Sequence, residues 1–210
     1  MQLSLELNAS QETKGFVLLA GYALPYEIEL LKELDQIIDA APLRHMVTPG
    51  GYSMSVATTS CGQVGWVSDR TGYRYSENNP ESGKQWPAMP EIFSSLAEAA
   101  AKEAGFPNFI PDACLINRYE ANSKLSLHQD KDEKDFKSPI VSVSLGLPAT
   151  FLFGGLERKD PVHRTVLSHG DIVVWGGANR LAYHGVSPLK DGFHPKLGNC
   201  RINLTFRKAL

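Results

Sequence analysis

The 210-residue sequence lacks the features that define several classes of protein. No stretch approaches the eighteen or so uninterrupted apolar residues of a membrane-spanning helix, so we expect no membrane association. The first ten residues, MQLSLELNAS, contain neither a basic segment nor a long apolar run, so we expect no secretion signal. Three widely spaced cysteines, Cys61, Cys114 and Cys200, predict neither a zinc site nor a disulfide framework. We interpret them as thiols in a reducing cytoplasm.

The sequence also lacks a charge excess, internal repeats and low-complexity segments. Its net charge of −2 argues against a strongly basic nucleic-acid-binding protein, although a local basic face would suffice to meet a short strand. An apolar fraction of 42% is ordinary for a globular protein. The length therefore predicts one domain over residues 1–210.

Two helices and an unusual segment between them are predicted in the first half. Residues 25–40 carry an apolar residue every three or four positions, as do residues 90–104. These stripes are Ile28, Leu31, Leu34 and Ile38, and Phe93, Leu96, Ala97, Ala100 and Ala104. Residues 45–88 are rich in Gly, Ser, Thr, Tyr and Asn, with short alternating pieces at 52–56 and 73–75. Long irregular segments of compact domains are often lids, so we interpret this one as a substrate-binding flap.

Short strands dominate the second half of the chain. They are predicted at residues 113–119, 125–129, 140–147, 150–153, 165–167, 171–175 and 201–207. Turn signals such as Gly154-Gly155 and Gly176-Gly177 separate several of them. The pattern favours a mainly β fold, a double-stranded β-helix or cupin-like jelly-roll barrel with helices packed on its outside.

The histidines suggest a metal centre. His128 and Asp130 are one strand period apart and should project to the same side. A non-haem oxygenase iron needs two histidines and one carboxylate, and His184 follows after several strands. The second His-x-Asp triplet, at His169, has too little chain after it for such a return, and we interpret it as a turn into the next strand. His163, two residues after Pro161, and His194, beside Pro195, are expected in exposed loops.

The last predicted strand alternates strictly between polar and apolar residues. Arg201, Asn203, Thr205 and Arg207 share one face. A solvated polar face is the ordinary explanation. On an inward face, the planar forks of the arginines would instead match the carboxylates of a dicarboxylic acid, and Asn117 and Tyr119 could add hydrogen bonds.

These residues, with several further segments, resemble the AlkB family of nucleic-acid repair dioxygenases. The further segments are Met46-Val-Thr-Pro-Gly-Gly-Tyr52, Trp86-Pro-Ala-Met-Pro90, Asp112-Ala-Cys-Leu-Ile-Asn-Arg-Tyr119, Leu125-Ser-Leu-His-Gln-Asp-Lys-Asp-Glu133 and Val174-Trp-Gly-Gly177. The resemblance covers residues 15 to 207. One segment, Glu120-Ala-Asn-Ser123, departs from the turn with Pro and Gly that is typical of the family.

The resemblance implies a cofactor set and a role for each site residue. It implies Fe(II) held by His128, Asp130 and His184, with 2-oxoglutarate and O2 as co-substrates. The 2-oxoglutarate residues would be Asn117, Tyr119, Arg201, Asn203 and Arg207. The substrate residues would be Trp66, Tyr73, Arg74, Tyr75, Asp132 and Arg158, which would bind a base methylated on a ring nitrogen.

The resemblance further implies oxidative demethylation of 1-methyladenine and 3-methylcytosine by a monomer. Single-stranded DNA is the expected substrate, and double-stranded DNA and RNA stay open. Two alternatives remain at this point. One is the same chemistry on a protein or small molecule, which Trp66 and Asp132 disfavour through the family match alone. The other is a cupin-like barrel that binds metal or RNA without turnover, which would not need Arg201 and Arg207.

Overall fold

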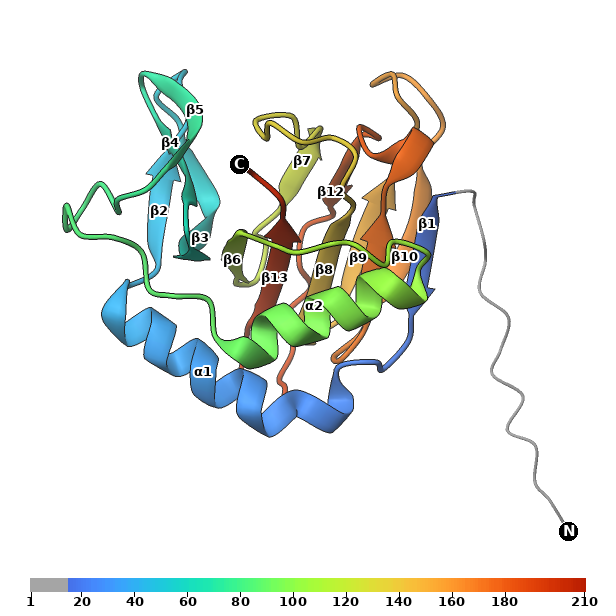
Figure 1. Cartoon of the computed structure of the whole chain (residues 1–210), viewed down its shortest axis with the longest axis horizontal. Helices are drawn as coiled ribbons and strands as arrows, with labels where there is room; N and C mark the ends of the chain where they lie inside the picture. Colours follow the sequence, from blue (N-terminus) through green and yellow to red (C-terminus); the bar gives the residue numbers. More distant parts are fainter. Residues whose placement is uncertain (1–14) are drawn as a thin grey trace, which may run out of the picture.

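The computed structural model describes residues 15–210 as a barrel of strands with two helices on one side (Figure 1). The strands are β1 Phe16–Leu19, β2 Arg44–Val47, β3 Ser53–Gly62, β4 Gly65–Asp69, β5 Gly72–Ser76, β6 Ala113–Tyr119, β7 Leu125–His128, β8 Ile140–Gly146, β9 Ala149–Phe153, β10 His163–Leu167, β11 Ile172–Trp175, β12 His184–Val186 and β13 Arg201–Arg207. The helices are α1 Glu27–Ala40 and α2 Glu91–Glu103, with short 3-10 turns η1 Leu24–Tyr26 and η2 Gly177–Asn179.

The strands form a large sheet, a small sheet and a separate ribbon. The large sheet has the order β1-β11-β8-β13-β6-β3-β2, the small sheet β10-β9-β12-β7, and the ribbon is β4-β5. Strand neighbours are antiparallel throughout the two sheets, and most are distant in sequence. This arrangement confirms the predicted jelly-roll barrel. Within residues 15–210, no helix is long and apolar enough to cross a membrane.

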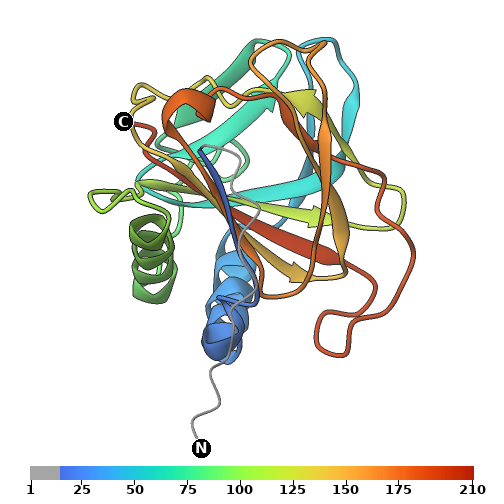
Figure 2. The same cartoon turned by 90° about the vertical axis from the view of Figure 1, so that its right-hand side faces the viewer.

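One apolar core lies between the helices and the outer face of the large sheet. Ile202, Leu204 and Phe206 of β13 belong to it, and α2 contributes Phe93 and Leu96. Figure 2 shows both helices on this one side of the barrel. A second core lies between the sheets and includes the aromatic rings of β9 and β11. Strict alternation on β13 therefore divides its side chains between the helix-covered core and the barrel interior.

The predicted helices are present, and one apolar stripe was partly wrong. Helix α1 buries Leu30, Leu34 and Ile37. Of the predicted residues, Leu34 is buried, Leu31 and Ile38 pack partly buried against the same core, and Ile28 is 80% exposed. The buried face of the helix is therefore wider than the predicted stripe and excludes Ile28. Helix α2 keeps its predicted stripe, except that Ala101 is buried where Ala104 was expected.

The segment predicted as a flap consists of two different parts. Strands β2 and β3 belong to the large sheet, where ten-residue β3 pairs with β6. Strands β4 and β5 pair only with each other, as a ribbon that Ser68 Oγ of β4 joins to β2 by donating to Val47 O (Figure 1). The flap expected at residues 45–88 stays a prediction.

The turn that departs from the family pattern, residues 120–123, is well formed. Asn122 has a φ of 68°, which asparagine tolerates better than most residues. Its backbone N–H donates to Leu189 O, and Ser123 Oγ donates to Ser55 O. The asparagine takes the left-handed position for which glycine is the usual residue.

Candidate metal centre and co-substrate cavity

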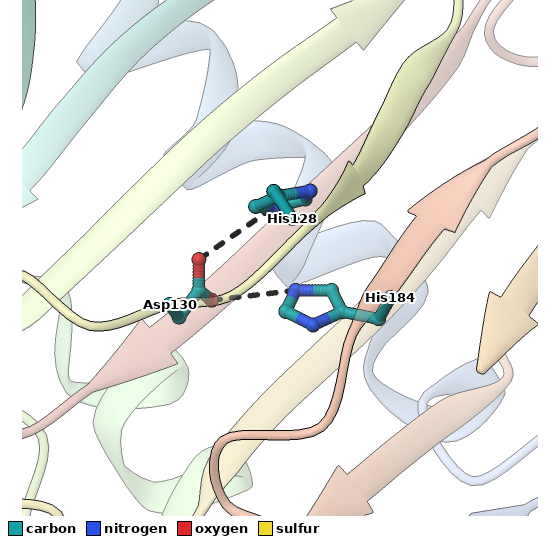
Figure 3. Close-up of side chains that lie close together, drawn as sticks. All are labelled: His128, Asp130 and His184. Carbon is teal, nitrogen blue, oxygen red and sulfur yellow. Dashed lines mark ion pairs between the residues drawn. The ribbon is translucent and has the colours of Figure 1, made fainter. Parts of the chain in front are cut away.

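Two histidines and one aspartate converge where the small sheet ends. His128 closes β7 and His184 opens β12, and the two are direct partners across the antiparallel pair. A Cβ on Gly185 would lie 2.6 Å from Leu125 O, so the glycine permits β12 to approach β7 closely. Asp130 follows two residues after β7, and Figure 3 shows the three side chains pointing toward one another. Their ligand atoms all lie within 4.8 Å of one another.

Backbone hydrogen bonds fix how both rings present their nitrogens. His128 Nδ1 lies 2.9 Å from Ser126 O, and His184 Nδ1 lies 3.0 Å from Ala182 O. Because a carbonyl oxygen only accepts, each Nδ1 carries the ring proton, and each Nε2 keeps a free lone pair. Both Nε2 atoms lie 3.6 Å from the carboxylate of Asp130. The donor set fits Fe(II), which oxygenases hold with two imidazoles and one carboxylate on one face.

The charges of the cluster also suit a divalent cation. Burial by itself raises the pKa of Asp130, but the positive charge of Arg207 is the largest opposing cause, and that pKa lies well below its usual value. Arg207 Nη2 donates to Asp130 Oδ2 over 2.6 Å. Burial and the neighbouring His128 lower the pKa of His184, so its imidazole stays neutral. A metal ligand must be deprotonated, and the lowered pKa values of Asp130 and His184 both favour that form.

A buried guanidinium near this cluster has unused hydrogen-bonding capacity. Arg201 is 1% exposed, and its Nη2 donates to Ser144 Oγ over 3.0 Å. Its Nε and Nη1 have no partner among the described residues, and its guanidinium lies 5.1 Å from the Tyr119 ring centroid. Burial lowers the pKa of Arg201. Leaving the buried charged donors of Arg201 unpaired is costly, so the site suits an anionic ligand. A carboxylate matches the planar geometry of the guanidinium.

The polar face of β13 lies inside the barrel and not in solvent. Arg201, Asn203, Thr205 and Arg207 are all buried, and they line a cavity of about 610 Å³. Asn117, Tyr119 and all three residues of the metal cluster line the same cavity. The solvated-face explanation is therefore excluded.

Within this face, two predicted co-substrate residues are already engaged. The amide of Asn203 donates to Ser142 Oγ and Val143 O, and accepts from Thr205 Oγ1. Arg207 is paired with Asp130 beside the metal cluster. The roles predicted for these residues, and for Asn117 and Tyr119, stay predictions.

Four of the six predicted substrate residues line the cavity. They are Trp66, Tyr73, Asp132 and Arg158. The Trp66 ring stacks on Tyr73, with ring centroids 5.5 Å apart and an interplanar angle of 12°. Trp66 Nε1 donates to Asp132 Oδ2 over 2.8 Å. The ring is thus held by the ribbon on one side and by the segment after β7 on the other.

The two remaining substrate residues lie elsewhere. Arg74 forms an ion pair with Asp69 at 2.7 Å on the exposed ribbon. Tyr75 donates from its hydroxyl to Glu133 Oε1 over 2.8 Å and accepts from Arg207 Nη1. Neither residue lines the cavity, so their contacts with a nucleic-acid backbone stay predictions.

The sequence did not reveal three residues that support the site. Glu133 is buried, with its carboxylate oxygens 3.3 Å from Arg180 and 3.4 Å from Arg207. Arg180 has no local signal, because its partners are distant in sequence. Ser144 could have been found, since Ser142 and Ser144 alternate with apolar residues on β8 and must face the barrel interior.

The other histidines lie apart from the metal cluster. His169 begins the turn before β11, as predicted, and His163 is exposed, although it opens strand β10. The expectation of an exposed loop was wrong for His194. It is partly buried and stacks on His169, with ring centroids 4.4 Å apart.

Comparisons with known proteins agree with this geometry. The sequence pattern of the 2OG-Fe(II) oxygenase superfamily matches residues 15–207. The alpha-ketoglutarate-dependent dioxygenase AlkB of Escherichia coli is 57% identical over 93% of this chain and 90% of its own length. The DNA N(6)-methyladenine demethylase ALKBH1C of Arabidopsis thaliana is 34% identical over 64% of this chain and 35% of its own length. The solved structure of OsALKBH1 superposes with a TM-score of 0.83 at 29% identity, covering 95% of this chain and all of the other. The chain is accordingly an Fe(II)- and 2-oxoglutarate-dependent dioxygenase, uses O2 as co-substrate, and belongs to the AlkB family.

Proposed function

We propose that this enzyme removes methyl groups from ring nitrogens of nucleic-acid bases and thereby repairs alkylated DNA. One observation carries the proposal. A single cavity joins the His128–Asp130–His184 cluster to the two unpaired donors of Arg201 and to an aromatic ring held beside a carboxylate, Trp66 with Asp132. The named activity of the AlkB relative supports the dioxygenase chemistry, and that of the ALKBH1C relative, demethylation of N(6)-methyladenine in DNA, supports a methylated base as the substrate.

The cavity residues divide into those that bind the keto acid and those that hold the metal. Arg201 takes the distal carboxylate of 2-oxoglutarate, with Asn117 and Tyr119 beside it, and Asn203 and Arg207 lie toward the end near the metal. His128, Asp130 and His184 hold Fe(II). When bound there, Fe(II) supplies the activation of dioxygen that oxidises both the keto acid and the methyl group.

The reaction consumes one O2 for each methyl group removed. One oxygen atom enters succinate as 2-oxoglutarate loses CO2, and the other hydroxylates the N-methyl carbon. The N-hydroxymethyl product then breaks its C–N bond, releases formaldehyde and leaves the base unmodified. No nucleophilic side chain is required for these steps.

The substrate residues suit a cationic base taken out of its stack. 1-Methyladenine and 3-methylcytosine are cations, which favour an aromatic face and a nearby carboxylate. Trp66 offers the ring, Asp132 the negative charge, and His128, which lines the same cavity, is the proposed contact with the other face of the base. Arg158, Tyr73, Arg74 and Tyr75 are the proposed contacts with the rest of the nucleic acid.

The finer features belong to the same proposal. The enzyme acts as a monomeric single domain in the cytoplasm, prefers single strands, and uses the ribbon β4–β5 with its flanking residues as the flap. A single strand is favoured because its bases need no unpairing before they enter the cavity.

The experiment that tests the function measures coupled products. The protein with Fe(II), 2-oxoglutarate and an oligonucleotide containing 3-methylcytosine should release succinate and formaldehyde in equal amounts. An unmethylated oligonucleotide of the same sequence serves as control and should release no formaldehyde. Succinate without formaldehyde on every methylated strand would instead favour hydroxylation of a protein or small molecule.

A further inference from the structure

Asp130 lies beyond the reach of the sheet that positions the two histidines. Strand β7 ends at His128, and its pairing with β12 ends at the His128–His184 partners. Residues 129–139 form no strand or helix. Arg207 of β13 holds the carboxylate of Asp130, but no strand pairing fixes the Asp130 backbone relative to the two imidazoles, although a metal centre requires a defined geometry.

Hydrogen bonds from two side chains take the place of strand pairing at Asp130. Gln129 Nε2 donates to Leu181 O over 2.6 Å, and Arg180 Nη1 donates to Asp130 O over 2.9 Å. The two hydrogen bonds run in opposite directions between the segment that carries Asp130 and the segment that leads into His184. The second is fully buried, and it satisfies a carbonyl that would otherwise lack a strand partner.

The guanidinium of Arg180 also holds the rest of the irregular segment. Its Nε donates to Ser138 O over 3.0 Å, and its Nη2 lies 3.3 Å from Glu133 Oε2. Arg180 is 2% exposed and follows directly after the turn η2. One planar fork thus contacts the segment near its start, in its middle and near its end. Between these points lies Asp132, which accepts from Trp66.

We propose that Gln129 and Arg180 are positioning residues that hold Asp130 in register with His128 and His184. Arg180 in addition places the segment that carries Asp132. The inference rests on the proposed metal centre. It assigns a role to the residue between the histidine and the aspartate of the motif. It also assigns one to an arginine 50 residues away from Asp130, whose guanidinium donates to the backbone carbonyl of Asp130 and not to its carboxylate.

Metal affinity tests the proposal without turnover. We would titrate the full-length protein with Co(II), a divalent ion stable to air, and follow its visible absorption, which depends on the arrangement of its donors. Gln129→Met keeps the side-chain length without the donor, and Arg180→Met keeps the aliphatic stem. Each should weaken Co(II) binding by about 10- to 100-fold, the range typical when a residue that hydrogen-bonds to a metal ligand is lost. Each should also alter the absorption spectrum of the bound Co(II). Gln36→Met and Arg118→Met, which remove exposed contacts elsewhere, should leave both unchanged.

Three further measurements distinguish a positioning role of Gln129 and Arg180 from a general loss of folded structure. Thermal unfolding confirms that each variant is folded before titration. Arg180→Lys keeps a cation beside Glu133 but has no fork for two carbonyls, so it should fold and still bind Co(II) about tenfold more weakly. Folded Gln129→Met and Arg180→Met proteins that bind Co(II) within twofold of the parent would overturn the proposal. If His184→Ala left Co(II) binding unchanged, the assignment of the metal centre itself would be wrong. This result is distinguishable from failure of the positioning proposal, which affects only the Gln129 and Arg180 variants.

Discussion

Two pairs of histidines in this molecule have the same spacing and different chemistry. In both the His128–His184 pair and the His169–His194 pair, the ring centroids are 4.4 Å apart. Each pair also has a carboxylate beside it, Asp130 in the first and Glu27 in the second. Proximity of two imidazoles and a carboxylate therefore does not distinguish a metal centre from a structural contact.

The pairs differ in which ring nitrogens remain available. At His169, Nδ1 accepts from the Gly146 N–H, and Nε2 lies 2.8 Å from Glu27 Oε1, so both nitrogens are engaged. His194 Nδ1 accepts from the Lys196 N–H. In the first pair, both Nδ1 atoms donate to carbonyls and both Nε2 lone pairs face one carboxylate. A metal needs lone pairs that no hydrogen bond has taken.

Deleting one ring from each pair should give the largest contrast. His184→Ala should abolish turnover and weaken Fe(II) binding by more than about 100-fold, since losing a ligand exceeds the effect of losing a contact behind one. His169→Ala should keep its iron. Bound iron after dialysis and succinate release measure both effects. Equal loss of iron in the two variants would contradict the assignment.

The same contrast extends to the two buried arginines of β13. Arg207 is paired with Asp130, whereas Arg201 has unpaired donors. Arg201→Lys keeps the charge and loses the bidentate fork, so the apparent KM for 2-oxoglutarate should rise by about 10- to 100-fold, as for a charged hydrogen bond of about 2 kcal/mol. Arg118→Lys, on the exposed side of β6, is the matched control. An unchanged KM would mean that another residue holds that carboxylate.

A smaller effect is expected where a ring stacks on substrate. Trp66→Ala should weaken binding of a methylated single strand by about 1–3 kcal/mol, roughly 5- to 100-fold, and an unmethylated strand much less. Affinity for 2-oxoglutarate should hardly change, because Trp66 belongs to the ribbon. Equal loss for both strands would make Trp66 a structural residue of the flap.

The smallest expected effect is the contribution of the His169–His194 pair to the pH dependence of stability. Burial, and then His169 and Lys196, lower the pKa of His194, while Glu27 acts in the opposite direction. The unfolded chain then binds the proton more tightly than the folded protein, so stability decreases as pH falls through about 6.5. His194→Gln should flatten this slope slightly between pH 7 and 5. Melting temperatures of the metal-free proteins at each pH measure it, and identical slopes would refute the contribution.

The sequence predicted best those elements whose own alternation is unambiguous. Strand β13 has the predicted bounds, because polar and apolar residues alternate through it. Strand β6 also has the predicted bounds, although its first four residues form an apolar run and do not alternate. Strand β3 was largely missed, since its buried residues are mostly Thr, Ser and Cys. They are small because β4 crosses close by, and a Cβ on Gly65 would lie 2.8 Å from Ser60 Cβ. Only the tertiary neighbour explains that composition.

The residues of the site likewise fall into those that the sequence pattern predicts and those that it does not. The metal cluster and the face of β13 follow from residue type and strand period. Glu133 and Arg180 gave no such signal, because an ion pair buried between distant segments leaves no periodic pattern in either. The engagement of Asn203 with its own sheet was equally hidden, since it depends on β8 as the neighbouring strand.

The place of β13 in the sheet has a consequence for synthesis of the protein. It is the last described strand in the sequence, yet it pairs with β6 on one side and β8 on the other, so it fills the middle of the large sheet. During translation, the strands on either side leave the ribosome before the strand that joins them. The nascent chain can form neither the closed sheet nor the carboxylate-binding face until Arg201–Arg207 has emerged. Non-local pairing of this kind folds slowly, so exposed edges of β6 and β8 make the incomplete chain the form most prone to aggregation.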